Sequence, residues 1–305
     1  MNKSLTEQWF DWFEERILSE FGMDVKKVAQ YQPDVSPLVY CCLHHKRVPV
    51  QKREVILSKK IQDGEWQKNK DWLNLKKAIE DGLDINLYMS KSLKNWNSID
   101  YLLYTLDIRH LHFRKNKDGG IGNELVFGVF VDEKFYAIDI GTHHNIYKAQ
   151  EMVSIAEKNW PTELFRYTQS IQARNTARID DKEFKRFAND DRYQFNLIAP
   201  AHGEREDGSS YALSNNQNSA IASCVLNGID YGKLPLRAWC AYDNEIRKIE
   251  QIQKHLRELH GTDKLILRID KKRKKYVVTV CKQRQVQKEF GFSKKEIICS
   301  LYDSY

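Results

Sequence analysis

Four of the nine histidines in this 305-residue chain lie within 35 residues, at His110, His112, His143 and His144. The first two belong to the segment IRHLHF, and the other two follow the segment KFYAIDIGT. Imidazole titrates near neutral pH, so two such side chains can take up and donate a proton within one turnover. Imidazole is also a common zinc ligand. The cluster therefore predicts either acid–base catalysis without a metal, or a zinc centre in which His143 or His144 joins His110 and His112. The alternative is that these are ordinary residues of a half-exposed strand and an exposed turn.

A metal-free pair of imidazoles suits the cleavage of RNA, whose 2′-hydroxyl is a nucleophile beside each phosphodiester bond. A base removes the proton of that hydroxyl, an acid protonates the departing 5′-oxygen, and cations stabilise the charge that develops. The nearby cations are Arg109, Arg114, Lys134 and Lys148. Arg109 is expected on the strand face opposite to the histidines. We therefore take Arg114 and Lys148 as candidates for catalysis and Lys134 as a candidate for holding RNA.

The segment 108–113 has the pattern of a β-strand, in which residues two apart share a face. Leu111 and Phe113 are expected on the core, which leaves His110 and His112 together on the open face, in an accessible cleft. The segments LVFGVFV and KFYAIDI predict two further strands of an antiparallel meander. Helices are expected on either side, at 98–106 and in AQEMVSIAEKNW. This unit would position all four imidazoles.

The N-terminal region has a helix and a hairpin in its pattern. Ser4 and Glu7 form a capping box for an amphipathic helix over 4–21 that ends at Gly22. The apolar and β-branched segment 37–58 predicts a β-hairpin, and 72–82 predicts a helix.

The C-terminal region mixes strands and helices. We expect a strand at 193–199, an amphipathic helix from Asp243 to Gly261, and a hairpin from KLILRID and KYVVTV. A second capping box at Ser293 predicts a last helix.

The predicted fold class is α+β: a helical N-terminal region with a hairpin, a small central antiparallel sheet flanked by helices, and a mixed α+β C-terminal module. The expected domains are 1–68, 69–166 as the catalytic module, and 167–305.

The composition indicates a folded protein that acts in the cytoplasm. Hydrophobic residues make up 41% of the chain and charged residues 30%, which is typical of a globular protein. No apolar run approaches the roughly 20 residues of a membrane span, so no membrane is expected as a partner. The six cysteines show no CxxC spacing, which favours a reducing compartment. The glycines of GGIG (119–122) indicate a turn, and no cofactor is expected.

The positive charge is concentrated in one segment of the chain. Between Lys264 and Glu296 there are twelve Lys or Arg against three Asp or Glu, a local charge of +9 in a chain whose net charge is +7. A local basic patch favours a polyanionic partner, although a solvated hairpin tip or an acidic protein partner would give the same pattern. The residues expected to bind nucleic acid are Lys271, Lys272, Arg273, Lys274 and Lys275.

The span from about Leu83 to Pro161 resembles a group of bacterial proteins associated with mobile elements and phage defence. Their shared core reads HLHL, LLF, YaIDI..H and NWP, which match HLHF (110–113), LVF (125–127), YAIDI (136–140) with His143 or His144, and NWP (159–161). The order of elements is also similar to RelE-type toxins of the barnase-like class. That resemblance implies metal-independent ribonuclease activity and adds Tyr136 to the catalytic candidates.

The leading interpretation is a metal-independent endoribonuclease of a bacterial toxin–antitoxin or anti-phage defence system. Its partners would be RNA and an antitoxin or another defence protein. The alternatives are a non-enzymatic nucleic-acid-binding protein and a zinc-dependent hydrolase. The candidate catalytic residues are His110, His112, His143, His144, Tyr136, Arg114 and Lys148.

Overall fold

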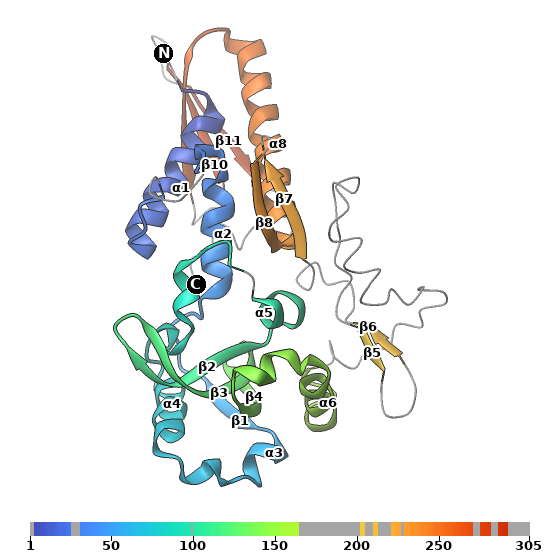
Figure 1. The fold of residues 1–305 in the computed structure, drawn as a ribbon. Helices are drawn as coiled ribbons and strands as arrows, with labels where there is room; N and C mark the ends of the chain where they lie inside the picture. Colours follow the sequence, from blue (N-terminus) through green and yellow to red (C-terminus); the bar gives the residue numbers. More distant parts are fainter. Residues whose placement is uncertain are drawn as a thin grey trace. The chain divides into compact units, whose positions relative to one another are not determined.

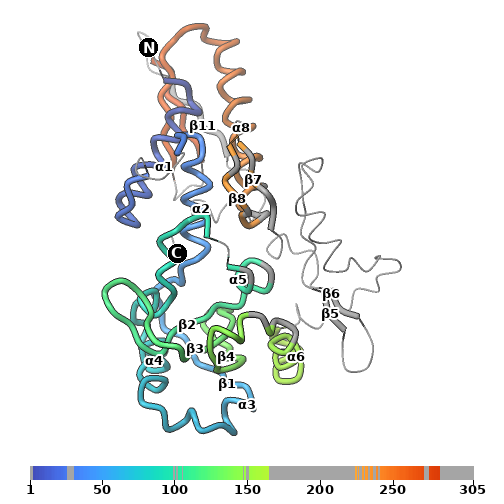
Figure 2. Tube along the Cα trace, in the orientation of Figure 1, coloured from blue at the N-terminus to red at the C-terminus, as the bar shows by residue number. Residues whose placement is uncertain are grey.

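The computed structural model describes residues 3–25, 31–98, 100–164, 202–204, 210–212, 221–226, 229–270, 275–281 and 286–291. These residues form two compact units (Figures 1 and 2). Unit 1 combines Met1–His45 with Cys224–Tyr305, and unit 2 is Lys46–Ser223. The protein is α+β, as the sequence predicts. The unit boundaries differ from the expected three segments, since residues 1–68 are shared between both units.

Unit 1 is built around the N-terminal helix. The elements described in it, together with the strand β7 that pairs with β8, are α1 (Leu5–Phe21), η2 (Pro33–Val35), α2 (Ser36–Lys46), β7 (Ile221–Leu226), β8 (Ile229–Pro235), α8 (Leu236–His260), β9 (Lys264–Asp270), β10 (Lys275–Cys281) and β11 (Val286–Gly291). The last three strands form an antiparallel sheet in the order β11-β10-β9. The predicted hairpin of β9 and β10 is confirmed.

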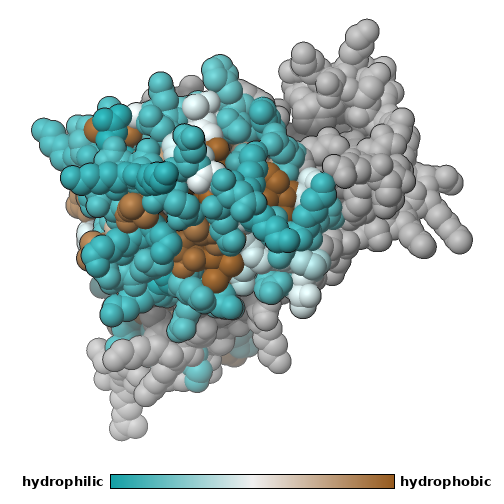
Figure 3. Space-filling view, turned by 90° about the horizontal axis from the view of Figure 1, so that it is seen from below, coloured by the Kyte–Doolittle hydropathy of each residue, from teal (hydrophilic) through white to brown (hydrophobic). Residues whose placement is uncertain are grey.

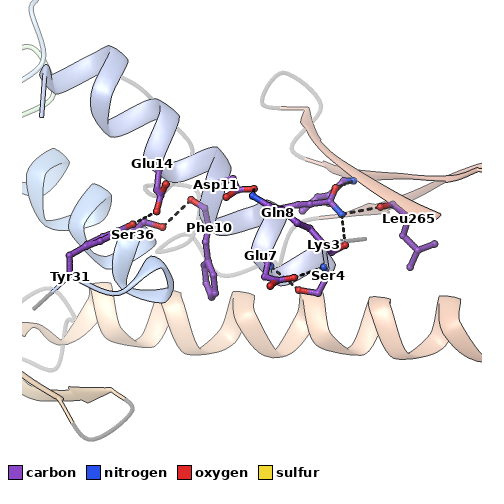
Figure 4. Close-up of polar contacts among 11 residues, drawn as sticks. Lys3, Ser4, Glu7, Gln8, Phe10, Asp11, Glu14, Tyr31, Ser36 and Leu265 are labelled. Carbon is purple, nitrogen blue, oxygen red and sulfur yellow. Dashed lines mark hydrogen bonds and ion pairs between the residues drawn. The ribbon is translucent and has the colours of Figure 1, made fainter. Parts of the chain in front are cut away.

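The start of α1 is held by polar contacts from its own cap and from distant residues. Ser4 and Glu7 form the predicted capping box, and Gly22 ends the helix with a φ of 63°. The Gln8 amide donates to the carbonyl of Leu265 over 2.9 Å (Figure 4). The Ser36 hydroxyl donates to the carbonyl of Phe10 over 3.0 Å. These bonds tie α1 to β9 and α2 within unit 1.

Two sequence predictions that involve unit 1 are wrong. The segment 37–58 is not a hairpin, because Ser36–Lys46 is helical and only Glu54–Leu57 is a strand. Nearly every residue of α2 is buried, so its apolar run lacks the polar face that identifies a surface helix. The helix α8 begins at Leu236 rather than at Asp243, which lies inside it and pairs with Arg247 at 2.9 Å. Its predicted end at Gly261 is confirmed.

Unit 2 contains a four-stranded sheet in the order β1-β4-β3-β2. Its strands are β1 (Glu54–Leu57), β2 (Arg109–Asn116), β3 (Gly119–Val131) and β4 (Lys134–Gly141). The predicted meander of β2, β3 and β4 is confirmed. The sheet is nevertheless mixed and not purely antiparallel, because β1 joins the edge of β4 in parallel.

The remaining elements of unit 2 are short helices, with one small two-stranded sheet. They are α3 (Lys59–Gln62), η3 (Glu65–Lys68), α4 (Lys70–Glu80), η4 (Asn86–Tyr88), η5 (Lys91–Lys94), α5 (Tyr101–Leu106), η6 (His143–Tyr147), α6 (Ala149–Asn159), β5 (His202–Glu204) and β6 (Ser210–Ala212). The predicted helices at 72–82, at 98–106 and before Trp160 are therefore present, each with shifted ends.

Both faces of the four-stranded sheet are covered. On one face Leu111 and Phe113 pack with α4 residues such as Trp72, whose ring centroid lies 5.6 Å from that of Phe113. On the other face Phe127 and Tyr136 pack against residues of α5 and α6. Figure 1 shows α4 and α6 on opposite sides of the strands. The expectation of an open second face is wrong, because the short flanking helices bury it.

Lys60 links three elements beside β4. Its ammonium group lies 3.0 Å from an oxygen of Asp139 on β4 and 2.8 Å from an oxygen of Glu151 on α6. The Asp139 side chain is only 3% exposed, whereas Lys60 is 48% exposed. A buried carboxylate needs a cation or hydrogen-bond donors, so Lys60 stabilises Asp139 where it stands.

Figure 3 shows a face on which hydrophilic residues predominate and hydrophobic areas are small. In the described part of the chain, no helix is both long enough and apolar enough to cross a lipid bilayer. The strand predicted at 193–199 and the helix predicted from Ser293 lie outside the described residues.

Replacement of Lys60 by Ala should destabilise unit 2, because it leaves the buried Asp139 carboxylate without its cation. We expect a loss of about 1–3 kcal/mol in the free energy of unfolding. Urea unfolding and amide hydrogen exchange in β4 measure the effect. The matched control is Lys76→Ala, which removes an exposed pair with Glu80 at 2.6 Å and should cost at most about 0.5 kcal/mol. Equal effects of the two variants would show that Asp139 does not depend on Lys60.

Candidate active site

His112 is held in one orientation and one tautomer. Its ring nitrogen Nδ1 lies 3.0 Å from the carbonyl oxygen of Gly122. A carbonyl oxygen can only accept, so Nδ1 carries the proton and donates it. In the neutral ring the lone pair is then on Nε2, which is the nitrogen able to act as a base. The residue is only 5% exposed.

The glycines of the β2–β3 hairpin create the place for this ring. A Cβ atom on Gly120 would lie 2.3 Å from Cδ2 of His112 and 2.6 Å from the carbonyl oxygen of Tyr88. Gly122 has a φ of 95°, which side chains other than that of glycine rarely tolerate. The pattern GGIG predicted a turn, but sequence reasoning missed that two of its glycines seat and orient His112.

The register of the sheet brings His143 to His112. His112 pairs with Leu125 on β3, and Leu125 pairs with Gly141 at the end of β4. Thr142 then caps η6, accepting a hydrogen bond from the His144 amide at 3.4 Å. The ring centroids of His112 and His143 lie 5.2 Å apart, with 52° between their planes. His143 is exposed, so this pair joins a buried imidazole to one that contacts water.

His110 shares the face of His112, as the strand periodicity predicts, and lies mostly buried beside a small pocket. Its Nδ1 atom is 3.8 Å from a carboxylate oxygen of Asp100, which caps α5. That distance permits attraction but is too long for a hydrogen bond. The pocket has an empty volume of about 290 Å³, including the part open to solvent. Its lining residues include Lys46, Ser90 and Ser92.

Burial sets the protonation of both β2 histidines. Desolvation lowers the pKa of His112; the hydrogen bond to Gly122 opposes this, and nearby His143 and His110 add to it. Desolvation likewise lowers the pKa of His110, opposed by Asp100 and supported by His143. Neutral imidazoles are therefore favoured at both positions. The expectation that His110 and His112 form an accessible pair is wrong for His112, which is buried. Of His110, His112 and His143, only His143 is exposed.

The other candidates for catalysis include both exposed and buried side chains. His144 is exposed on η6. Tyr136 is buried against Trp160, with ring centroids 5.2 Å apart. Arg114 is exposed on β2, with Nε 3.7 Å from Asp71. Lys148 is exposed and lies 3.6 Å from Glu151.

The candidates for nucleic-acid binding are widely spread. Lys134 is the first residue of β4, at the opposite end of that strand from His143 and roughly 23 Å away along it. Lys271, Lys272, Arg273 and Lys274 lie outside the described residues, and Lys275 begins β10 in unit 1.

The described histidines do not form a metal site. Among the residues that the structure describes, no group of three or more His, Cys, Asp or Glu side chains is placed to hold a metal ion. In particular, Nδ1 of His112 is already used by the carbonyl of Gly122.

A scan of protein-family models, a search of curated proteins and a search of solved structures each found no match to this chain. Function must therefore be inferred from the chain's own residues.

The lowered pKa values predict that acid destabilises unit 2. Because the folded pKa of His110 and His112 lies below the unfolded value of 6.5, the unfolded chain binds more protons as the pH falls. The stabilising difference is fully present above about pH 6.5 and is lost as the pH falls toward the folded pKa. His110→Asn and His112→Asn should each reduce the loss of unfolding free energy between about pH 7.5 and pH 5.5. An unchanged pH dependence in both variants would contradict burial of neutral rings.

Gly120→Ala should destabilise the hairpin through contact with the His112 ring. We expect a cost of about 1–3 kcal/mol, typical of overpacking in a filled site. The cost should be smaller in a His112→Ala background, since one of the two clashing groups is then absent. A double-mutant cycle of urea unfolding measures this coupling. Equal costs in both backgrounds would show that Gly120 does not seat the imidazole.

Proposed function

We propose that this protein is a metal-independent endoribonuclease, in which His112 and His143 form the acid–base pair. The observation that carries the proposal is the contact between a buried imidazole of fixed tautomer and an exposed imidazole, with ring centroids 5.2 Å apart. Two adjacent imidazoles in different environments can hold different protonation states at one pH. General acid–base catalysis needs that difference.

In the proposed reaction, Nε2 of His112 removes the proton from a 2′-hydroxyl of RNA. The 2′-oxygen then forms a bond to the adjacent phosphorus, and the bond from phosphorus to the 5′-oxygen of the next nucleotide breaks. Protonated His143 donates its proton to that departing oxygen. The products are a 2′,3′-cyclic phosphate and a free 5′-hydroxyl, so no water and no metal is consumed in this step.

The roles follow from burial and from mutual repulsion. Desolvation disfavours a charge on His110 and His112, and a charge on His143 lowers the pKa of both further. His112 is thereby kept neutral, as a base must be, while His143 lies next to water, where the proposal places the acid.

Two other functions use the same residues. A zinc-dependent hydrolase needs a third ligand beside two histidines, and the described residues offer no such set. A nucleic-acid-binding protein without activity needs no acid–base pair, so this function does not explain the fixed tautomer of His112. The suggested role in toxin–antitoxin or anti-phage defence rests on the resemblance of the segments HLHF, YAIDI and NWP.

The two neighbouring histidines of η6 provide a matched comparison. His112→Ala and His143→Ala should each lower the rate of RNA cleavage by about 10²–10⁴ and change RNA affinity by only a few-fold. His144→Ala should retain nearly full activity. Single-turnover cleavage of a labelled RNA measures the rates. An equal loss in His143→Ala and His144→Ala would contradict the assignment.

The chemistry of the products separates the three functions. Cleavage should continue in EDTA, leave a 2′,3′-cyclic phosphate, and stop when the nucleotide at the cut site is 2′-deoxy. Loss of activity in EDTA, with restoration by zinc, would favour the hydrolase. Binding of RNA with no cleavage under any condition would favour the non-enzymatic protein.

A further inference from the structure

The tip of the β2–β3 hairpin and the neighbouring η5 carry a group of exposed cations. Lys115 and Lys117 lie at the end of β2 and in the turn, and Lys91 and Lys94 lie on η5. All four side chains are exposed. We call these four lysines the hairpin basic surface.

Backbone contacts hold η5 against the hairpin. The amide of Gly120 donates to the carbonyl of Met89 over 2.7 Å. A Cβ atom on Gly119 would lie 3.4 Å from the Cα atom of Lys91. Lys115 is the cross-strand partner of Gly120. Lys91 and Lys115 therefore flank Gly119 and Gly120.

The same glycines connect this surface to His112. Gly120 faces the His112 ring, and Lys115 is three residues, or roughly 10 Å, further along β2. The outer residues of β3, 119–124, have no pairing partner on β4, whose last residue Gly141 pairs with Leu125. The hairpin consequently extends past the end of β4, the end at which His143 stands.

The charges of the hairpin basic surface are not neutralised within the described residues. None of the four ammonium groups has a described carboxylate at ion-pair distance, and Lys115 instead lies 4.6 Å above the ring of Tyr88. Arg114 differs, because Asp71 lies 3.7 Å from its Nε atom. Asp118, in the turn, is the acidic residue that adjoins the lysines in sequence. Four like charges on so short a segment repel one another, and a polyanion relieves that repulsion.

We propose that the hairpin basic surface binds the phosphates of a single RNA strand beside the bond to be cut. This inference rests on the proposed function, because continuity with the His112–His143 pair is what favours RNA over an acidic protein. A single strand is favoured over a duplex because double-stranded RNA is recognised across about 16 base pairs. The four lysines occupy only one hairpin and one short helix. Phosphate contacts of this kind position the strand without reading its sequence.

The test compares two variants of the full chain that carry the same change in charge. In the first, Lys91, Lys94, Lys115 and Lys117 are replaced by Gln. In the control, four exposed lysines elsewhere in unit 2, Lys52, Lys59, Lys68 and Lys70, are replaced by Gln. The probe is a labelled single-stranded RNA with 2′-O-methyl groups throughout, which cannot be cleaved through its 2′-oxygen. Its binding is measured over a range of salt concentrations.

The first variant, called the hairpin variant, should bind the probe at least about tenfold more weakly than the wild type. Removing one lysine that binds a phosphate flattens the plot of log affinity against log salt by about 0.7, so the slope should change by about 3 if all four lysines contribute. The control variant should bind the probe with nearly the affinity and the salt dependence of the wild type. The double variants Lys91→Gln with Lys94→Gln, and Lys115→Gln with Lys117→Gln, should each give about half the change in slope and guard against a folding defect.

Because the probe is not cleaved, this test is separate from that of the proposed function. If the hairpin variant loses binding and the wild type never cleaves RNA, the proposed RNA-binding surface would be supported and the proposed nuclease activity would be wrong. Three results would overturn the surface: no binding of the probe by the wild type, equal binding by wild type and hairpin variant, or equal losses in both lysine variants. Stronger capture of an acidic peptide than of RNA by these lysines would also overturn it, in favour of a protein partner.

Discussion

The hydrogen bond from Nδ1 of His112 to the carbonyl of Gly122 is the interaction on which the candidate site depends. It leaves Nε2 as the basic nitrogen and holds the ring against the hairpin. Gly122, whose carbonyl accepts this bond, has a φ of 95°, and Gly120 leaves room for the ring. The β2–β3 hairpin therefore has two roles, as part of the sheet and as the support of the proposed base.

Burial of the sheet on both faces gives the site its electrostatic character. The helices α5 and α6 cover the face that carries His110 and His112, and desolvation lowers the pKa of both rings. His143 lies beyond the end of β4, where this cover stops, and is exposed. The proposed base and acid thus differ because one lies within the sheet and the other follows its last strand. The packing that buries His112 and leaves His143 exposed therefore also sets their proposed roles in proton transfer.

Sequence periodicity predicted the elements but not the environment of the site. The strand at IRHLHF, the meander and the shared face of His110 and His112 follow from alternation, which is a local property. The cover over that face could not be predicted, because α5 is only six residues long and its packing depends on distant contacts. Adjacent His143 and His144 were equivalent in the sequence, and the structure distinguishes them because the His143 ring contacts that of His112. The helix α2 was missed since it is buried on all sides and shows no amphipathic pattern.

The tautomer and protonation of His112 test the central claim most directly. Nitrogen-15 NMR of the full chain, labelled at histidine and titrated with acid, reports the proton on each ring nitrogen; a His112→Asn spectrum assigns the signal. We expect Nδ1 protonated and Nε2 unprotonated at neutral pH, with a pKa below the ordinary value of 6.5. A His112 ring protonated at Nε2 alone, or a pKa above 6.5, would contradict a neutral base held by Gly122.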